Sequence, residues 1–166
     1  MYEVHIYIET DSISPRPTNK QYGYVLECRT AAGDLRTREG FGRFCGTYNR
    51  VVLRGIIEAM NRLNQPCEVH VHTTDDFVVG MIERNLEHWA EAGFLTAKGT
   101  PVANREEWEQ LWKLAQTQLL FAGAGRHAYY SWLLSEMERR KNEQQNCKQR
   151  GGNGFQGDAA ANDRSL

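Results

Sequence analysis

The chain has 166 residues, of which 40% are hydrophobic, and this is enough for one domain with a substantial core. Twenty basic and twenty-one acidic residues give a formal charge of −1, which excludes the strong positive field of a protein that binds nucleic acid by phosphate contacts alone. The four cysteines form no Cys-x-x-Cys pair, and no apolar run reaches the length of a signal peptide or membrane span. We therefore expect reduced thiols, a cytoplasmic location and no membrane partner.

Three strands are predicted in the first part of the chain. Residues 2–9 alternate apolar and polar side chains, which is the period of a strand with one buried face. Residues 21–30 and 36–44 restore the strand pattern after polar turns. Strands joined by such short turns form an antiparallel meander.

The pattern then alternates between helix and strand. Apolar residues recur at three- and four-residue steps in 47–63, which predicts a helix with Thr47 or Asn49 as its N-cap. The later predicted elements are strand 67–74, helix 75–94, helix 104–118, strand 119–126 and helix 128–145. This order predicts an α/β (α+β) fold, a five-stranded mixed sheet flanked by helices.

The domain is predicted to end near the last helix. Residues 1–141 carry the periodic apolar pattern, whereas residues 142–166 are rich in Gln, Asn, Gly and small polar side chains. Such a segment has little to bury, so we expect a disordered tail.

The centre of the chain resembles a known family. The stretches CEVHVHTTDDFVVGMI and HWAEAGFLTAKGTPVANREEWEQL are similar, without a gap from Cys67 to about Leu111, to the centre of bacterial-type ribonuclease H. Upstream, VHIYIE resembles the family's first strand and GTYNRVVLRGIIEAM resembles the start of its first helix. The resemblance covers roughly residues 4–138 and implies the ribonuclease H-like fold.

The resemblance also implies a chemistry. That family hydrolyses the RNA strand of RNA–DNA hybrids with two Mg²⁺ ions roughly 3.5 to 4 Å apart, held by acidic side chains. Its four acidic positions align with Glu9, Val52, Thr74 and a position near Leu133 or Leu134. Val52 and Thr74 supply no carboxylate, so the resemblance points to an eroded site.

Neighbouring carboxylates could replace the missing ones. Asp11 shares a strand face with Glu9 if the strand continues, and Asp75 follows Thr74 directly. Glu136 is the nearest acidic residue on the last helix, and His127 resembles the family's mobile loop histidine. A rebuilt site would use Glu9, Asp11, Asp75 and Glu136, with Glu9 and Asp75 as the best metal candidates for Mg²⁺ or Mn²⁺.

Two interpretations therefore stay open. In the first, Asp75 and Asp76 only cap the following helix, and the protein is a module that binds RNA, an RNA–DNA hybrid or a protein partner, with weak or no nuclease activity. In the second, the displaced carboxylates form a divergent but active Mg²⁺- or Mn²⁺-dependent ribonuclease H.

Polar and basic residues provide a candidate nucleic-acid surface. Asn19, Asn49 and Arg50 resemble residues with which the family contacts the hybrid backbone. Positive charge also gathers in the N-terminal half, and this set could equally be an ordinary solvated surface: Lys20, Arg36, Arg38, Arg43, Arg50, Arg54 and Arg62.

A pair of alternating histidines suggests a further possibility. His70 and His72 share one face of their predicted strand, and the first strand is expected beside it. His5 or Glu9 could then complete a transition-metal site, although such histidines are more often only packed or hydrogen-bonded.

Overall fold

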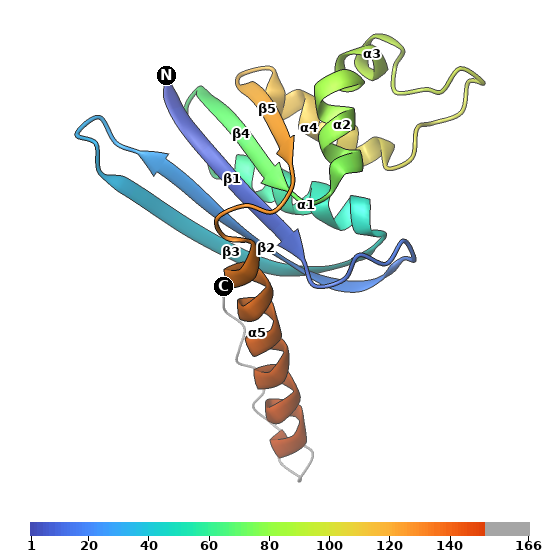
Figure 1. Ribbon diagram of the computed structural model, residues 1–166. Helices are drawn as coiled ribbons and strands as arrows, with labels where there is room; N and C mark the ends of the chain where they lie inside the picture. Colours follow the sequence, from blue (N-terminus) through green and yellow to red (C-terminus); the bar gives the residue numbers. More distant parts are fainter. Residues whose placement is uncertain (152–166) are drawn as a thin grey trace.

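The computed structural model describes residues 1–151, with the side chains of residues 1–146 (Figure 1). Five strands form one mixed sheet in the order β3-β2-β1-β4-β5. The first three strands pair antiparallel, whereas β1 pairs parallel with β4, and β4 with β5. The mixed sheet predicted from the sequence is confirmed. Its strands are β1 (Tyr2–Thr10), β2 (Thr18–Arg29), β3 (Leu35–Gly46), β4 (Cys67–Thr73) and β5 (Leu119–Ala124).

Five helices accompany the sheet in the described part of the chain: α1 (Tyr48–Met60), α2 (Asp76–Arg84), α3 (Leu86–Glu91), α4 (Arg105–Ala115) and α5 (Tyr130–Gly151). The single helix predicted over 75–94 is wrong, because the chain forms α2 and α3 instead. The interruption falls at Asn85, whose backbone has φ −119° and ψ −17°. Asparagine has a low helix propensity because its side chain competes for nearby backbone groups, which explains a break there.

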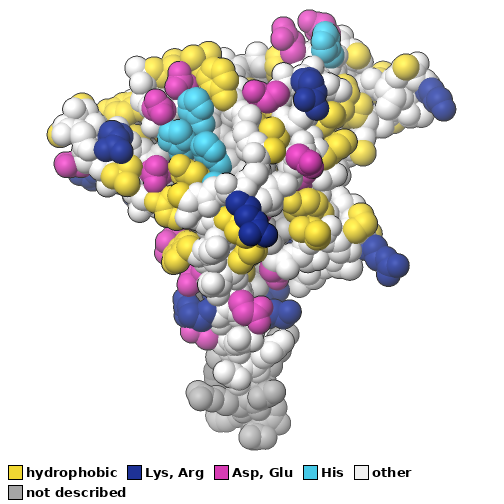
Figure 2. Space-filling model, in the orientation of Figure 1, with side chains coloured by type: hydrophobic (Ala, Val, Ile, Leu, Met, Phe, Trp, Pro, Cys, Tyr) yellow, Lys and Arg dark blue, Asp and Glu magenta, His cyan; other side chains and the backbone are white. Residues whose placement is uncertain are grey.

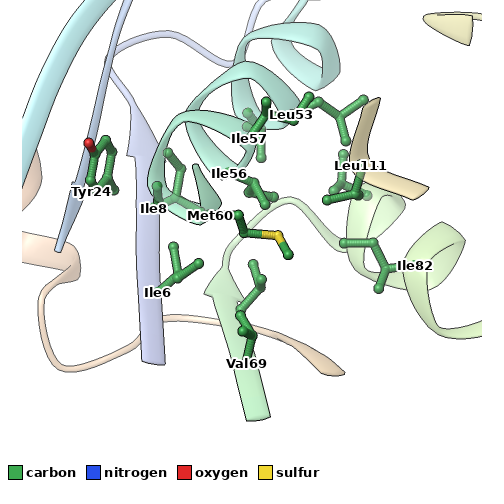
Figure 3. Packing of buried hydrophobic residues seen from close by; sticks show 14 of the residues in the cluster. Ile6, Ile8, Tyr24, Leu53, Ile56, Ile57, Met60, Val69, Ile82 and Leu111 are labelled. Carbon is green, nitrogen blue, oxygen red and sulfur yellow. The ribbon is translucent and has the colours of Figure 1, made fainter. Parts of the chain in front are cut away.

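One face of the sheet packs against α1 and forms the main core. The alternate residues Val4, Ile6 and Ile8 of β1 point toward this helix, and all three are buried. Figure 3 shows Ile6 and Ile8 facing Ile56 and Met60 of α1. The other residues of β1, among them Tyr7 and Glu9, therefore point to the opposite face.

The opposite face is covered only in part. Leu133 and Met137 of α5 pack on Val25 of β2, and Tyr7 and Phe41 border this small cluster. In Figure 1, α5 projects from the end of the sheet near β2 and β3, away from β5. Farther from α5, side chains on this face stay exposed or half-buried, among them Glu3 and His5 of β1, His70 of β4 and Phe121 of β5.

The predicted domain end at 141 does not coincide with the end of an element. Residues 142–151 continue α5, which corrects the prediction of a disordered tail for this stretch. Arg139 is ion-paired with Glu143 one turn later, and Arg43 of β3 donates a hydrogen bond of 2.7 Å to Gln144. These contacts stabilise the helix beyond the apolar pattern that the prediction followed. Residues 152–166 of the predicted tail lie outside the described residues.

None of the described helices combines the length and apolar character that a membrane-spanning segment needs.

Candidate functional site

Glu9 near the end of β1 is the centre of a buried hydrogen-bond network. Its side chain is only 4% exposed, and the Thr74 hydroxyl donates to its Oε1 at 2.6 Å. Its Oε2 accepts from the backbone N–H of Thr74 at 3.1 Å and lies 2.8 Å from Nε2 of His127. Both oxygens of this carboxylate are thus bonded to protein groups, as buried charged groups require.

The contacts of His127 indicate which ring nitrogen carries the proton when the imidazole is neutral. The backbone N–H of Tyr129 donates to His127 Nδ1 at 3.3 Å, so Nδ1 must carry a lone pair. The proton of a neutral ring then resides on Nε2, from which it is donated to Glu9. The His127 side chain is 5% exposed and is part of the Glu9 network.

Asp75 lies one residue after Thr74 and faces a different environment. It is the N-cap of α2, where its Oδ1 accepts from the backbone N–H of Val78 at 3.1 Å. The amide nitrogen of Asn49 donates to Asp75 Oδ1 and Oδ2 at 3.1 and 2.8 Å when it faces the carboxylate. Burial is the main cause that raises the pKa of Asp75 to about 6, and the carboxylates of Asp76 and Glu9 add to the rise.

This raised pKa predicts that Asp75 weakens folding as the pH rises. The folded state holds the proton up to about pH 6, whereas the unfolded chain loses it near pH 4, so stability falls between these values. Relative to Asp75→Asn, which still caps a helix but does not ionise, the wild-type free energy of unfolding should drop by roughly 2 to 3 kcal/mol over this range. Urea unfolding across the range measures both proteins; parallel stability curves would contradict the prediction.

Asp11 and Glu136 have partners of their own. Asp11 Oδ1 accepts from the backbone N–H of Gln21 at 2.9 Å, just beyond the end of β1. Glu136 on α5 is paired with Arg139 and lies 3.4 Å from Arg140 Nε. The hydrogen bond from Arg139 holds the pKa of Glu136 below its ordinary value. Neither carboxylate hydrogen-bonds within the network around Glu9.

Val52 and Leu133, at or near the remaining aligned positions, are completely buried. Val52 belongs to the main core between the sheet and α1, and Leu133 belongs to the small cluster beneath α5. Among the residues described, one set of three possible ligands has its ligand atoms within 4.8 Å of one another, and it contains none of Glu9, Asp11, Asp75 and Glu136. The set of Glu9, Asp11, Asp75 and Glu136 is thus not among the ligand groups found in the described residues, and a site rebuilt from it stays a prediction.

The three polar residues expected to contact nucleic acid differ in their exposure and in their partners. Asn19 is exposed on β2, whereas Asn49 faces Asp75. Arg50 Nε lies 3.1 Å from Oε2 of buried Glu107, in an ion pair that is not aligned as a hydrogen bond. Arg50 is thus partly neutralised by the protein itself.

Lys20 is not part of a basic surface, which corrects the sequence-based grouping. It is completely buried, and its ammonium group donates to Arg16 O at 2.7 Å, Thr18 Oγ1 at 2.8 Å and Gly46 O at 2.6 Å. The remaining arginines include a group that we call the arginine groove. Arg36 and Arg38 of β3 and Arg62 after α1 line it, together with Leu26, Cys28 and Leu63. No acidic side chain is among its described lining residues.

The sheet order and the helices define an α/β protein with a five-stranded mixed sheet, and comparisons with known proteins identify the family. The family model of RNase H matches residues 3–123. A ribonuclease H of Rhizobium meliloti is 35% identical over 108 residues, which cover 64% of this chain and 68% of that protein. A ribonuclease H of Thermus thermophilus is 41% identical over 71 residues, 42% of this chain and 43% of that protein. The chain belongs to the ribonuclease H family.

Solved structures agree with this fold. LC9-RNase H1, described as a type 1 RNase H with the type 2 active-site motif, aligns with a TM-score of 0.67 at 19% identity and covers 87% of this chain and 74% of that one. The foamy viral protease-reverse transcriptase in complex with RNA/DNA hybrid aligns with a TM-score of 0.56 at 13% identity, covering 82% of this chain and 19% of that one. The ribonuclease H-like fold expected from the sequence is confirmed.

Sequence reasoning missed the partners of the site residues. Thr74 was recognised only as a missing ligand, yet it supplies two of the three contacts to Glu9. The alternation along the two strands could have indicated this contact. Tyr7 lies opposite His72 in the parallel pair, so two residues further on Glu9 and Thr74 are expected opposite each other on the same face of the sheet. Nothing in the sequence indicated that Gln21 would bind Asp11.

Proposed function

We propose that this ribonuclease H family protein binds RNA or RNA–DNA hybrids with weak or no hydrolysis. The observation that carries the proposal is the state of Glu9, whose two carboxylate oxygens accept three hydrogen bonds from Thr74 and His127. A Mg²⁺ ion needs several oxygen ligands in near-ideal octahedral geometry and holds them by charge. A carboxylate already bonded on both oxygens, beside a threonine, does not fit a two-metal cluster.

The other aligned positions support the same proposal. Val52 is completely buried in the core. Asp75 caps α2 and accepts hydrogen bonds from Asn49, and Glu136 is ion-paired with arginines. Losing ligands from a two-metal site removes the charge that stabilises the transition state, which is most of the catalysis. Mg²⁺ and Mn²⁺ therefore have no catalytic role in the proposed function.

The arginine groove is the part of the surface best suited to a phosphate backbone. Arg36 and Arg38 alternate along the exposed edge strand β3, and Arg62 approaches from the end of α1. Arg62 Nη1 donates to the Tyr24 hydroxyl at 3.0 Å and to Glu39 O at 3.2 Å, which orients its guanidinium group. Guanidinium groups bind phosphate without reading sequence, so the groove suits a general backbone contact.

The alternative remains an active Mg²⁺- or Mn²⁺-dependent ribonuclease H. One observation favours it: Glu9 is close enough to Asp75 to help raise the pKa of that carboxyl group. A conformational change that releases Glu9 from Thr74 and His127 would be needed before these two carboxylates could share a metal ion.

One set of samples tests binding and hydrolysis together. A labelled RNA–DNA hybrid is incubated with Mg²⁺ and then Mn²⁺, beside the variant Glu9→Gln with Asp75→Asn, and its binding is followed by fluorescence anisotropy at several salt concentrations. We expect no cleavage that separates the wild type from this variant. We also expect Arg36→Gln with Arg38→Gln to bind roughly 10-fold more weakly and to lower the salt slope by about 1.5.

The matched control is Arg84→Gln with Arg105→Gln, which removes the same charge from α2 and α4. It should leave the salt slope unchanged if the arginine groove is the contact. Metal-dependent cleavage that is lost in the Glu9 and Asp75 variant would overturn the proposal that the protein has weak or no nuclease activity. Equal losses of binding in both arginine variants would overturn the arginine groove as the binding surface.

A further inference from the structure

The open face of the sheet carries a grid of histidines and glutamates that the proposed function does not use. In the parallel register of β1 and β4, Glu3 lies opposite Glu68, His5 opposite His70 and Tyr7 opposite His72. All these side chains point away from α1, as Glu9 does. Figure 2 shows histidine side chains gathered in one patch, with acidic side chains close by.

Two carboxylates and two imidazoles meet at the first two rows of this grid. His70 Nε2 lies 2.8 Å from Glu68 Oε2, and His5 Nε2 lies 2.9 Å from Glu3 Oε1. The rings of His5 and His70 are stacked, with centroids 5.0 Å apart and planes 19° from parallel. Both histidines thus present the same ring nitrogen to the glutamate row.

Three of these residues bring their ligand atoms into one small volume. Possible ligand atoms of Glu3, Glu68 and His70 all lie within 4.8 Å of one another. Zinc binds histidine nitrogen and carboxylate oxygen at about 2.0 to 2.2 Å, so adjacent ligand atoms in its sphere are roughly 3 Å apart. The contact between His70 and Glu68 already has this spacing, and only Glu3 must move inward.

His5 and His72 connect to these three residues through hydrogen bonds that end at Glu3. His5 Nδ1 lies 2.8 Å from His72 Nε2. Because the Glu3 carboxylate only accepts, Nε2 of a neutral His5 ring carries the proton that is donated to Glu3. Nδ1 of the same ring then accepts from His72 Nε2. This chain holds Glu3 in the direction of His70.

We propose that Glu3, Glu68 and His70 bind one divalent transition-metal ion of the Zn²⁺ class, with His5 as a positioning residue for Glu3. Imidazole together with carboxylate favours Zn²⁺, Co²⁺ or Ni²⁺ over Mg²⁺. The side chains of Glu3, Glu68 and His70 are 60%, 36% and 30% exposed, which leaves room for the ion to enter and for water to complete its sphere.

This site is separate from the carboxylate positions of the family. Glu3 precedes Glu9 by six residues on the same strand, which is about 20 Å at roughly 3.3 Å per residue. The sequence had suggested His70 and His72 completed by His5 or Glu9. The structure instead directs His72 toward His5 and places Glu3 and Glu68 beside His70.

Calorimetric titration with Zn²⁺ tests the proposal without any nucleic acid, so its outcome is independent of the proposed function. The wild type should bind one ion, and Glu68→Gln with His70→Gln should bind it roughly 100-fold more weakly or not at all. The matched control, Glu91→Gln with His88→Gln, removes an exposed histidine and glutamate from α3 and should bind as the wild type does. Equal affinity in all three proteins would overturn the proposal.

The role of His5 has its own readout. His5→Gln keeps all three ligands and should weaken binding roughly 10- to 100-fold, as loss of an outer-shell partner does. Co²⁺ as a coloured probe reports the ligand type: we expect a spectrum of nitrogen and oxygen ligands, without a thiolate charge-transfer band. A thiolate band would assign the ion to cysteines and overturn the site.

Discussion

Replacing Val52 with glutamate is expected to lower the free energy of unfolding by roughly 4 kcal/mol or more, because a carboxylate would be buried there without a partner. Val52 has no exposed surface and is part of the main core. The resemblance to ribonuclease H matches this position with an acidic ligand of the family, so the substitution tests whether this part of α1 can face a metal site. The measurement is urea unfolding near neutral pH, with and without millimolar Mg²⁺.

The control for this prediction is Val52→Ala, which creates a cavity but introduces no charge. It should cost roughly 2 kcal/mol, and the difference between the two variants isolates the buried carboxylate. The glutamate variant should regain stability as the pH falls, because protonation removes the charge. If Val52→Glu were as stable as Val52→Ala, or were rescued by Mg²⁺, the position would be open to the site and an active enzyme would be favoured.

The second large effect is expected at Lys20. Its ammonium group is completely buried, and it joins the loop before β2 to the end of β3 through Arg16 O, Thr18 Oγ1 and Gly46 O. Lys20→Met keeps the length of the side chain but removes every donor. It should cost roughly 3 kcal/mol, because three oxygens lose a charged hydrogen-bond partner.

Lys113→Met on α4 is the matched control, since Lys113 is exposed. It should change stability by less than about 0.5 kcal/mol. Thermal or urea unfolding compares the two variants with the wild type. Similar stability of both variants would show that water replaces the ammonium group and that the buried contacts contribute little.

Most of the fold could be predicted from local pattern. The alternation of Val4, Ile6 and Ile8 indicated a strand with one buried face, and the three- and four-residue steps of α1 indicated its inner side. Periodicity is a property of neighbouring residues, so a single sequence displays it. The breaks were harder to predict, because Asn85 interrupts a helical pattern that continues on both sides.

The candidate site could be predicted only as a set of positions. The resemblance located Glu9, Val52 and Thr74: Glu9 lies on β1 and Val52 on α1 as expected, whereas Thr74 lies directly after the end of β4. Whether Asp75 faces Glu9 or caps α2 depended on how the chain turns after β4, which alternation alone does not decide. The structure shows Asp75 as the N-cap of α2, and its role as a metal ligand stays a prediction.

The sequence by itself determined the elements, their order and the residue types available at each position. Only the tertiary structure decided the partners: Glu9 with Thr74 and His127, and Glu3 and Glu68 with His70. The reason is physical, because these pairs depend on the register between strands and on loops that bring residues together across long stretches of chain. A hydrogen bond or a ligand sphere is a relation between side chains in space, and local periodicity does not contain it.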